Sequence, residues 1–151
     1  MEWLNSEGIK RIQEKLCGNT ELLRTITIEE VNSTLKRMGK EKAPGPDKVP
    51  TEAFTHAPIN IIEFVVDLFN KCISTKVIPD SWKISKLFLI HKGGKETLEN
   101  YRPIALLNSI YKIFASILNN RLNNLINDKN IIHSHQSGFQ RGRSTSSRIW
   151  L

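Results

Sequence analysis

Five basic side chains surround one short segment that has the residue types of a β-hairpin: Lys83, Lys86, Lys92, Lys95 and Arg102. Lysine supplies a mobile point charge, and arginine forms bidentate hydrogen bonds to phosphate oxygens. A two-stranded ribbon with a glycine tip can therefore clamp a triphosphate between such groups. A lysine-rich strand edge that discourages aggregation explains the same residues, and this alternative is favoured when the segment is considered alone.

A second candidate is the polar run between residues 136 and 145, near the end of the chain. Its aromatic ring, two arginines and two glycines suit base stacking and contact with the backbone of a nucleic acid strand. The residues concerned are Gln136, Gly138, Phe139, Arg141, Gly142 and Arg143.

Two neighbouring patterns do not carry the chemistry that they suggest at first. The run Gly93-Gly94-Lys95 lacks the spacing of a P-loop, because Glu96 follows the lysine where that motif needs Ser or Thr. His133 and His135 have no nearby cysteine or carboxylate partners, so solvated loop histidines are favoured over a metal site.

The charge of the chain is concentrated in its second half. The whole sequence has 22 Lys plus Arg against 15 Asp plus Glu, a net charge of +7. Residues 1–75 hold 10 basic and 11 acidic side chains, whereas residues 76–151 hold 12 basic and 4 acidic ones. Clustered basic groups neutralise phosphates and release condensed counterions, which indicates a polyanionic partner. A solvated basic face explains the charge equally well.

The totals indicate one globular domain. A chain of 151 residues with 39% hydrophobic and 25% charged residues has an ordinary composition for a packed protein. Cys17 and Cys72 form no Cys-x-x-Cys pair, so neither zinc nor a disulfide framework is indicated, and a reducing, intracellular setting fits best. The start of the chain has no secretory signal, and no apolar run is long enough to span a membrane, so we predict neither secretion nor membrane insertion.

The elements before the basic hairpin are expected to be helical, with one proline-rich interruption. A helix is predicted over 28–38, because Thr27 and Glu30 have capping-box spacing and apolar residues follow at helical intervals. Three prolines forbid regular helix between residues 40 and 50, where Gly45 allows a tight turn. An apolar stripe that begins at Ile59 predicts a core helix over about 58–74. A short helix is also expected near residues 5–17.

The hairpin and the longest helix follow. Ile84–Ile90 is rich in β-formers, leads to the turn pair Gly93-Gly94 and pairs with a second extended run near Tyr101. Asn108 is expected to cap a helix whose apolar face includes Ile110, Ile113, Phe114, Ile117, Leu118, Leu122 and Leu125. The three tryptophans, Trp3, Trp82 and Trp150, are expected to anchor a core or an interface.

Taken in order, five segments resemble the reverse transcriptases of non-LTR (LINE-like) retrotransposons. They are Lys42–Asp47, Ile78–Lys83, Asn100–Asn108, Tyr111–Ile113 and Gln136–Phe139. Each piece alone fits an ordinary turn or core element, but their order and spacing between residues 42 and 139 make the match specific. The resemblance covers roughly residues 28–147.

The resemblance implies an α+β fold, mainly helical with a small β-hairpin. This is the fingers part of a right-hand polymerase, without the catalytic strands of the palm. Residues 1–27 would be an N-terminal lead-in helix or linker, and residues 28–151 a partial reverse transcriptase domain. The implied partners are an RNA template, a DNA primer, a dNTP and the missing palm and thumb, with no membrane. The family also admits a nuclear location.

The resemblance also implies roles for single residues. Lys92 and Arg102 would contact the triphosphate of the incoming nucleotide. The Ala43–Asp47 loop, with Pro44, Gly45 and Asp47, would support or touch the template path. The residues that would lie near the template or primer are Gln136, Gly138, Phe139, Arg141 and Arg143. One departure is Lys48, because the family usually has glycine there and a side chain disfavours a turn with positive φ.

Catalytic acids are not recognisable in this sequence. Polymerisation in the family uses two divalent metals, Mg²⁺ by implication, held by aspartates that lie downstream in the family's order of motifs. The four aspartates here, Asp47, Asp67, Asp80 and Asp128, match none of those motifs. We therefore expect no catalytic residue, no metal site and no cofactor in this chain, and no polymerase activity from the chain alone. A fragment of an RNA-directed DNA polymerase is favoured over a stand-alone basic nucleic-acid-binding module, and a structural interaction protein is a third alternative.

Overall fold

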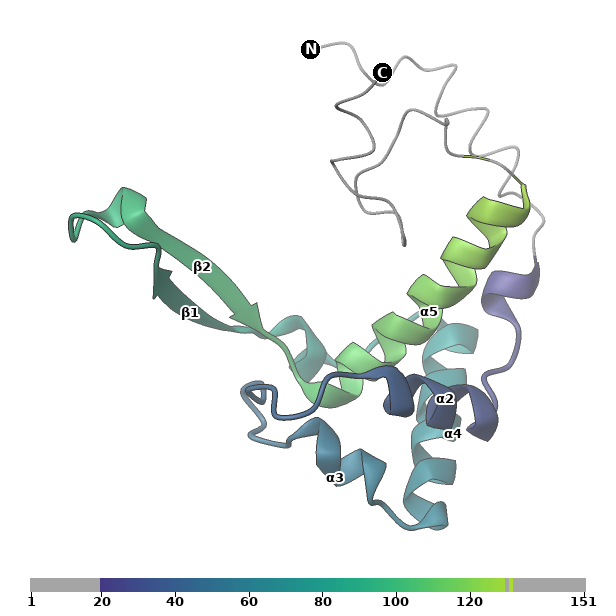
Figure 1. Cartoon of the computed structure of the whole chain (residues 1–151). Coiled ribbons are helices and arrows are strands. Elements are labelled where there is room, and N and C mark those ends of the chain that lie inside the picture. The colour runs from purple at the N-terminus through teal and green to yellow at the C-terminus, as the bar shows by residue number, and fades with distance from the viewer. Residues whose placement is uncertain (1–19, 130, 132–151) are drawn as a thin grey trace. The chain divides into compact units, whose positions relative to one another are not determined.

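The computed structural model describes residues 20–129 and residue 131, and in this part of the chain it shows helices with one small antiparallel sheet (Figure 1). The elements are a 3-10 helix (Thr20–Leu23), α2 (Ile28–Arg37), α3 (Thr51–Thr55), α4 (Ile59–Thr75), a 3-10 helix (Asp80–Lys83), β1 (Lys86–His91), a 3-10 helix (Leu98–Asn100), β2 (Tyr101–Leu106) and α5 (Ser109–Asp128). The predicted mainly helical α+β composition is confirmed. The predicted helix at 5–17, the polar run at 136–145, His133, His135, Trp3 and Trp150 lie outside the described residues.

The chain divides into two compact units. The larger unit is Leu23–Asn119, which contains the helices α2 to α4, the hairpin and the first half of α5. The described residues of the other unit are 20–22, 120–129 and 131, and among them the buried Arg121 donates a hydrogen bond from Nη1 to the Leu22 carbonyl at 3.1 Å. Among the described residues, no helix combines the length and the apolar character that crossing a membrane requires.

The helix α2 begins where the sequence predicts. The Thr27 hydroxyl accepts a hydrogen bond from the Glu30 backbone N–H at 3.3 Å, which satisfies one of the free donors at the helix N-terminus. Acidic residues occupy the first turn and basic residues the last, in the order that the helix dipole favours. The helix ends one residue before the predicted end, at Arg37, with Met38 as its C-cap.

The helix α4 supplies the largest share of the core. Pro58 precedes it, and its buried residues follow one face: Ile62, Val65, Phe69 and Cys72. Burial raises the pKa of the Cys72 thiol. Ile59, which the apolar pattern assigns to the same stripe, is 59% exposed because it stands in the first turn, before the helix meets its partners. The helix ends at Thr75, and its C-cap, Lys76, has a φ of 57°, in the left-handed region.

An aromatic cluster joins α4 to the segment before the hairpin and to α5. Trp82 is 4% exposed, as predicted for a core anchor, and its ring lies 6.1 Å from Phe69 and 5.6 Å from Phe114, centroid to centroid. The Tyr111 ring, also from α5, lies 5.9 Å from Trp82, centroid to centroid. Because Trp82 belongs to the short 3-10 helix just before β1, this cluster fixes the point from which the hairpin leaves the core.

A single amide side chain fastens the segment before α2 onto α4. Asn70 accepts a hydrogen bond from the Ile26 backbone N–H at 2.7 Å and donates one from Nδ2 to the Ile26 carbonyl at 3.0 Å. Asn70 therefore satisfies both backbone groups of a residue that is 1% exposed. A buried backbone group without a partner carries a desolvation penalty.

We expect Asn70→Ala to lower the free energy of unfolding by about 1–2 kcal/mol, because two buried backbone groups lose their partners. The measurement is urea denaturation followed by circular dichroism. Asn32→Ala is the matched control, since Asn32 is exposed on α2 and the change brings a similar gain in helix propensity. Equal stability of the two variants would show that the Asn70 amide does not hold Ile26.

The hairpin is the part of the larger unit that extends away from its helices. In Figure 1, β1 and β2 project from the helices and connect to them at one end only. Every residue of β1 is exposed, and the four central residues of β2 are exposed as well. The predicted hairpin is confirmed, and it offers both faces for contacts.

Candidate nucleic-acid interface

The strand register divides the hairpin into two faces. β1 and β2 are antiparallel, and Phe88 pairs with Ile104 while Ile90 pairs with Arg102. Directly opposed residues in an antiparallel pair share a face, and side chains alternate along each strand. Arg102 therefore lies on the face of Phe88 and Ile104. Lys92 follows Ile90 by two residues, and its backbone N–H donates to the Asn100 carbonyl at 2.7 Å, so the alternation carries Lys92 to this face as well.

The tip of the hairpin is organised by glycines and by one asparagine. Gly93 and Gly94 have φ values of 97° and 84°, which side-chain-bearing residues rarely adopt. The Asn100 amide donates to the Lys95 carbonyl at 2.6 Å, and the Lys92 ammonium donates to the Glu99 carbonyl at 3.4 Å. These contacts hold two lysines at the end of the ribbon, where they are exposed to solvent.

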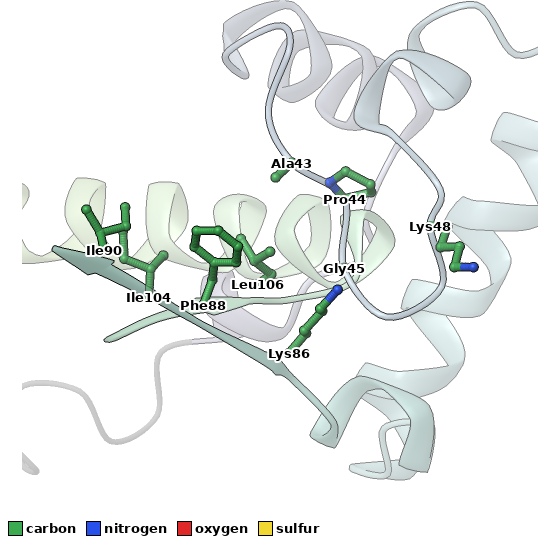
Figure 2. A pocket seen from close by; sticks show the side chains of 9 residues that line it. All are labelled: Ala43, Pro44, Gly45, Lys48, Lys86, Phe88, Ile90, Ile104 and Leu106. Atoms are coloured by element: carbon green, nitrogen blue, oxygen red, sulfur yellow. The ribbon is translucent and has the colours of Figure 1, made fainter. Parts of the chain in front are cut away.

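A groove lies along the same face of the hairpin, nearer its base. Its volume is about 450 Å³, and we call it the hairpin groove. Figure 2 shows the side chains of the strands standing on one side of the hairpin, with the proline-rich loop of residues 40–50 above them. The lining residues are Ala43, Pro44, Gly45, Lys48, Lys86, Phe88, Ile90, Ile104 and Leu106. The floor is apolar and includes one aromatic ring, whereas the basic residues belong to the loop and the start of β1.

The proline-rich loop is fastened to the N-terminus of α5. The Asn108 side chain accepts a hydrogen bond from the Asp47 N–H at 3.4 Å and donates one to the Ser81 carbonyl at 3.1 Å. The Ser109 hydroxyl donates to the Val49 carbonyl at 2.7 Å. Asn108 stands directly before α5, where the sequence predicts a cap, and its carbonyl accepts a hydrogen bond from the Lys112 N–H at 3.1 Å. Its side-chain amide in addition joins the loop to the 3-10 helix that precedes β1.

Glycine is required in the loop for a different reason from the predicted one. The turn exists, with the Lys48 N–H donating to the Gly45 carbonyl at 3.0 Å. The residue with positive φ in that turn is Lys48, at 58°, and not Gly45. A Cβ atom at Gly45 would lie 2.5 Å from the backbone of Leu107 and Asn108, so the absent side chain permits a close approach of two backbones.

The acidic side chains of this region do not form a metal site. The described residues contain no group of three or more His, Cys, Asp or Glu side chains that could hold a metal ion. Asp47 accepts a hydrogen bond from the Val49 N–H at 3.2 Å. The hydrogen bond from the Lys83 ammonium at 2.6 Å and its charge lower the pKa of Asp80. The Mg²⁺ that the resemblance implies does not fit these residues, and we derive no chemical step through it.

The predicted site residues are brought together in part. Pro44 and Gly45 line the hairpin groove, and Asp47 lies beside it in the same loop. Arg102 and Lys92 lie farther along the same face. The template or primer candidates Gln136, Gly138, Phe139, Arg141 and Arg143 lie outside the described residues.

Sequence reasoning missed the apolar floor of the groove. Phe88, Ile90 and Ile104 are exposed on the face that carries Arg102. The sequence contained an indication of this floor. Phe88 and Ile90 are two residues apart on one strand, as are Arg102 and Ile104 on the other, so each pair must share a face. Placing both pairs on one face required the register of the two strands, which depends on the length of the hairpin tip.

Comparison with known proteins identifies the class. Residues 90–150 match the family model "Reverse transcriptase (RNA-dependent DNA polymerase)". The matched segment begins inside β1 and includes Lys92 and Arg102. Residues 90–150 are therefore similar to this family of polymerases.

Relatives with known names define the family more closely. The chain is 33% identical over 129 residues to the probable RNA-directed DNA polymerase from transposon BS of Drosophila melanogaster. It is 32% identical over 122 residues to the probable RNA-directed DNA polymerase from transposon X-element, and 30% identical over 129 residues to that from mobile element jockey, both of the same organism. These matches cover 84%, 80% and 84% of this chain. Over most of its length, the chain is similar to RNA-directed DNA polymerases of non-LTR transposons.

The matched segment is a small part of each relative. It spans 14% of the length of the BS and jockey proteins and 13% of the X-element protein. The chain therefore corresponds to one segment of such a polymerase.

Proposed function

We propose that this chain is the fingers segment of a right-hand reverse transcriptase, and that its hairpin holds the incoming dNTP and the RNA template. The observation that carries the proposal is the strand register. It gives Arg102 and the residues of the hairpin groove one common face, with Lys92 next along it. A groove with an apolar floor and cationic ends suits a nucleotide, whose base is flat and whose phosphates are anionic.

Each part of this face has a separate proposed role. Arg102 and Lys92 bind the triphosphate, since a guanidinium forms two parallel hydrogen bonds to phosphate oxygens and an ammonium adds a mobile charge. The apolar floor, with Phe88, receives a base of the template strand by stacking. Pro44, Gly45 and Asp47 support the template from the loop side.

Three further proposals concern the rest of the polymerase. Gln136, Gly138, Phe139, Arg141 and Arg143 contact the template or the DNA primer. The palm and thumb, with the acidic residues that hold Mg²⁺, act together with this segment and supply the bond-making step. Residues 1–27 serve as a lead-in to a polymerase domain that begins near residue 28. The residues of this chain bind and orient, and none of them transfers a proton or a phosphoryl group.

The test is the affinity of the purified chain for dTTP, measured by isothermal titration calorimetry. We expect Arg102→Ala to weaken binding roughly tenfold, because a charge-assisted bidentate contact to phosphate is lost. Arg37→Ala is the matched control, since Arg37 is an exposed arginine on α2, away from the hairpin face. It should leave the affinity unchanged.

The same two variants separate this proposal from a general basic surface. If binding is simply electrostatic, both substitutions weaken it equally, and the loss disappears at high salt. That result would support the stand-alone basic nucleic-acid-binding module. Absence of any dTTP or RNA binding by the native chain would contradict both functions.

A further inference from the structure

The loop that forms one wall of the hairpin groove contains a lysine in an unfavourable backbone conformation. Lys48 has a φ of 58°, in the left-handed region where a Cβ atom is crowded by the backbone. Both of its neighbours are fastened to α5. Asp47 donates its N–H to the Asn108 side chain at 3.4 Å, and the Val49 carbonyl accepts from the Ser109 hydroxyl at 2.7 Å.

These flanking contacts explain how the conformation is maintained. With residues 47 and 49 both hydrogen-bonded to the start of one helix, the residue between them has little freedom to change its φ. The turn is closed from within by the Lys48 N–H, which donates to the Gly45 carbonyl at 3.0 Å. The conformation of Lys48 is therefore imposed by the fold, and glycine is the residue that would adopt it without strain.

A second lysine lines the same groove as Lys48. Lys48 and Lys86 both line the hairpin groove, one from the loop and one from β1, and Figure 2 shows the Lys86 side chain reaching from β1 toward the loop at Gly45. Both residues are exposed. Within the part of the chain that the structure describes, neither side chain has a hydrogen bond or an ion pair with another residue, whereas Lys112 donates to the Ala43 carbonyl and Lys83 to Asp80.

We propose that Lys48 and Lys86 form a phosphate clamp at the base of the hairpin groove, which grips a phosphodiester group of a single nucleic acid strand. This inference rests on the proposed function, since the strand is the one whose bases lie on the groove floor. The clamp is a separate site from Lys92 and Arg102, which stand toward the tip on the far side of Phe88 and Ile104. Two lysines beside an apolar floor suit a strand that presents alternating phosphates and bases.

The backbone strain makes the clamp testable, because replacing Lys48 by glycine should raise the stability of the fold and lower its affinity for nucleic acid. Lys48→Gly removes both the cation and the strain. We expect the melting temperature to rise by about 2–6 °C, since glycine adopts the left-handed region freely. We expect the affinity for single-stranded oligouridylate of about 12 nucleotides to fall roughly three- to fivefold near physiological salt.

Lys76→Gly is the matched control. Lys76 has a φ of 57°, is exposed at the C-terminal end of α4 and lines no part of the hairpin groove. Its replacement removes the same charge and the same strain, so the melting temperature should rise in the same way while oligouridylate affinity stays at the native value. Lys86→Gln is a second test of the clamp and should weaken binding as Lys48→Gly does.

Fluorescence anisotropy with labelled oligouridylate at a series of salt concentrations gives the deciding quantity. Loss of one phosphate contact should reduce the slope of log K against log salt by about 0.7 for Lys48→Gly, with no change for Lys76→Gly. Identical affinities and slopes for these two variants would overturn the clamp. If Arg102→Ala still weakened dTTP binding in that case, the proposed function would stand without the clamp. A native chain that bound neither ligand would overturn both.

Discussion

Replacing Trp82 by alanine is expected to lower the free energy of unfolding by about 3–5 kcal/mol, the range for removal of a large aromatic side chain from a core. Trp82 is 4% exposed and contacts the rings of Phe69, Phe114 and Tyr111, so the space it leaves is lined by side chains from two helices. Those helices cannot close the space without moving apart from their other partners. Urea denaturation followed by far-ultraviolet circular dichroism, which does not depend on the replaced tryptophan, gives the difference in the free energy of unfolding.

The control is Phe64→Ala on α4. Phe64 is a large aromatic residue that is 65% exposed, so its removal creates no cavity and should change stability by less than about 1 kcal/mol. The Trp82 variant should also lose oligouridylate affinity, because Trp82 fixes the segment from which β1 leaves the core. Comparable stability of the two variants would show that the aromatic cluster does not hold the base of the hairpin.

Local signals were sufficient to predict most elements of this fold. The start of α2 depends on a cap three residues from its partner, and the proline-rich loop depends on prolines within it. The hairpin was recognisable because β-forming runs flank a glycine pair, and Gly93 and Gly94 do adopt positive φ. In each case the residues that determine the structure are close neighbours in sequence, so a pattern of types and spacing contains the information.

The contacts that the sequence did not predict concern side chains whose partners are distant in sequence. Asn108 had the correct type and position for a helix cap. Its side-chain amide also forms hydrogen bonds with the backbone of Asp47 and of Ser81, which are 61 and 27 residues away. Residue type alone cannot distinguish these uses, because an asparagine side chain serves equally in a cap and in a link between loops.

The candidate site was predictable in its charges and not in its shape. The residue types suited either phosphate binding or a lysine-rich strand edge, and the family resemblance selected Lys92 and Arg102 before any register was known. The hairpin groove became visible only when the register aligned Phe88 with Ile104 and tertiary contacts brought Pro44 above them. A site formed by a strand pair and a loop some 40 residues earlier depends on packing, which no local pattern specifies.

The close approach of the loop to α5 leads to the second large prediction. We expect Gly45→Ala to lower the free energy of unfolding by about 2–3 kcal/mol, as for an added methyl group that the surroundings cannot accommodate. A Cβ atom there would lie 2.5 Å from the Asn108 nitrogen and from the Leu107 carbonyl group, and backbone atoms at the start of a helix cannot shift cheaply. Gly45 is not among the residues with positive φ, so the contact alone produces the penalty.

Gly39→Ala is the matched control because it should act in the opposite direction. A Cβ atom at Gly39 would lie 2.8 Å from Cε of Lys42, the far end of a flexible side chain that can move aside. Without a steric penalty, alanine reduces the conformational freedom of the unfolded chain and should stabilise the fold by about 0.4–1 kcal/mol. Thermal melts of the two variants should therefore move apart from the native value in opposite directions.

Binding measurements extend this comparison from the fold to the hairpin groove. Because Gly45 lines the groove, a loop displaced from α5 should weaken oligouridylate binding, while the triphosphate contacts of Arg102 near the tip should remain and dTTP affinity should change little. A general loss of structure would instead weaken both ligands together. If Gly45→Ala were as stable as Gly39→Ala and bound oligouridylate normally, the loop would not be seated on the start of α5, and the wall of the groove would have to be formed by other residues.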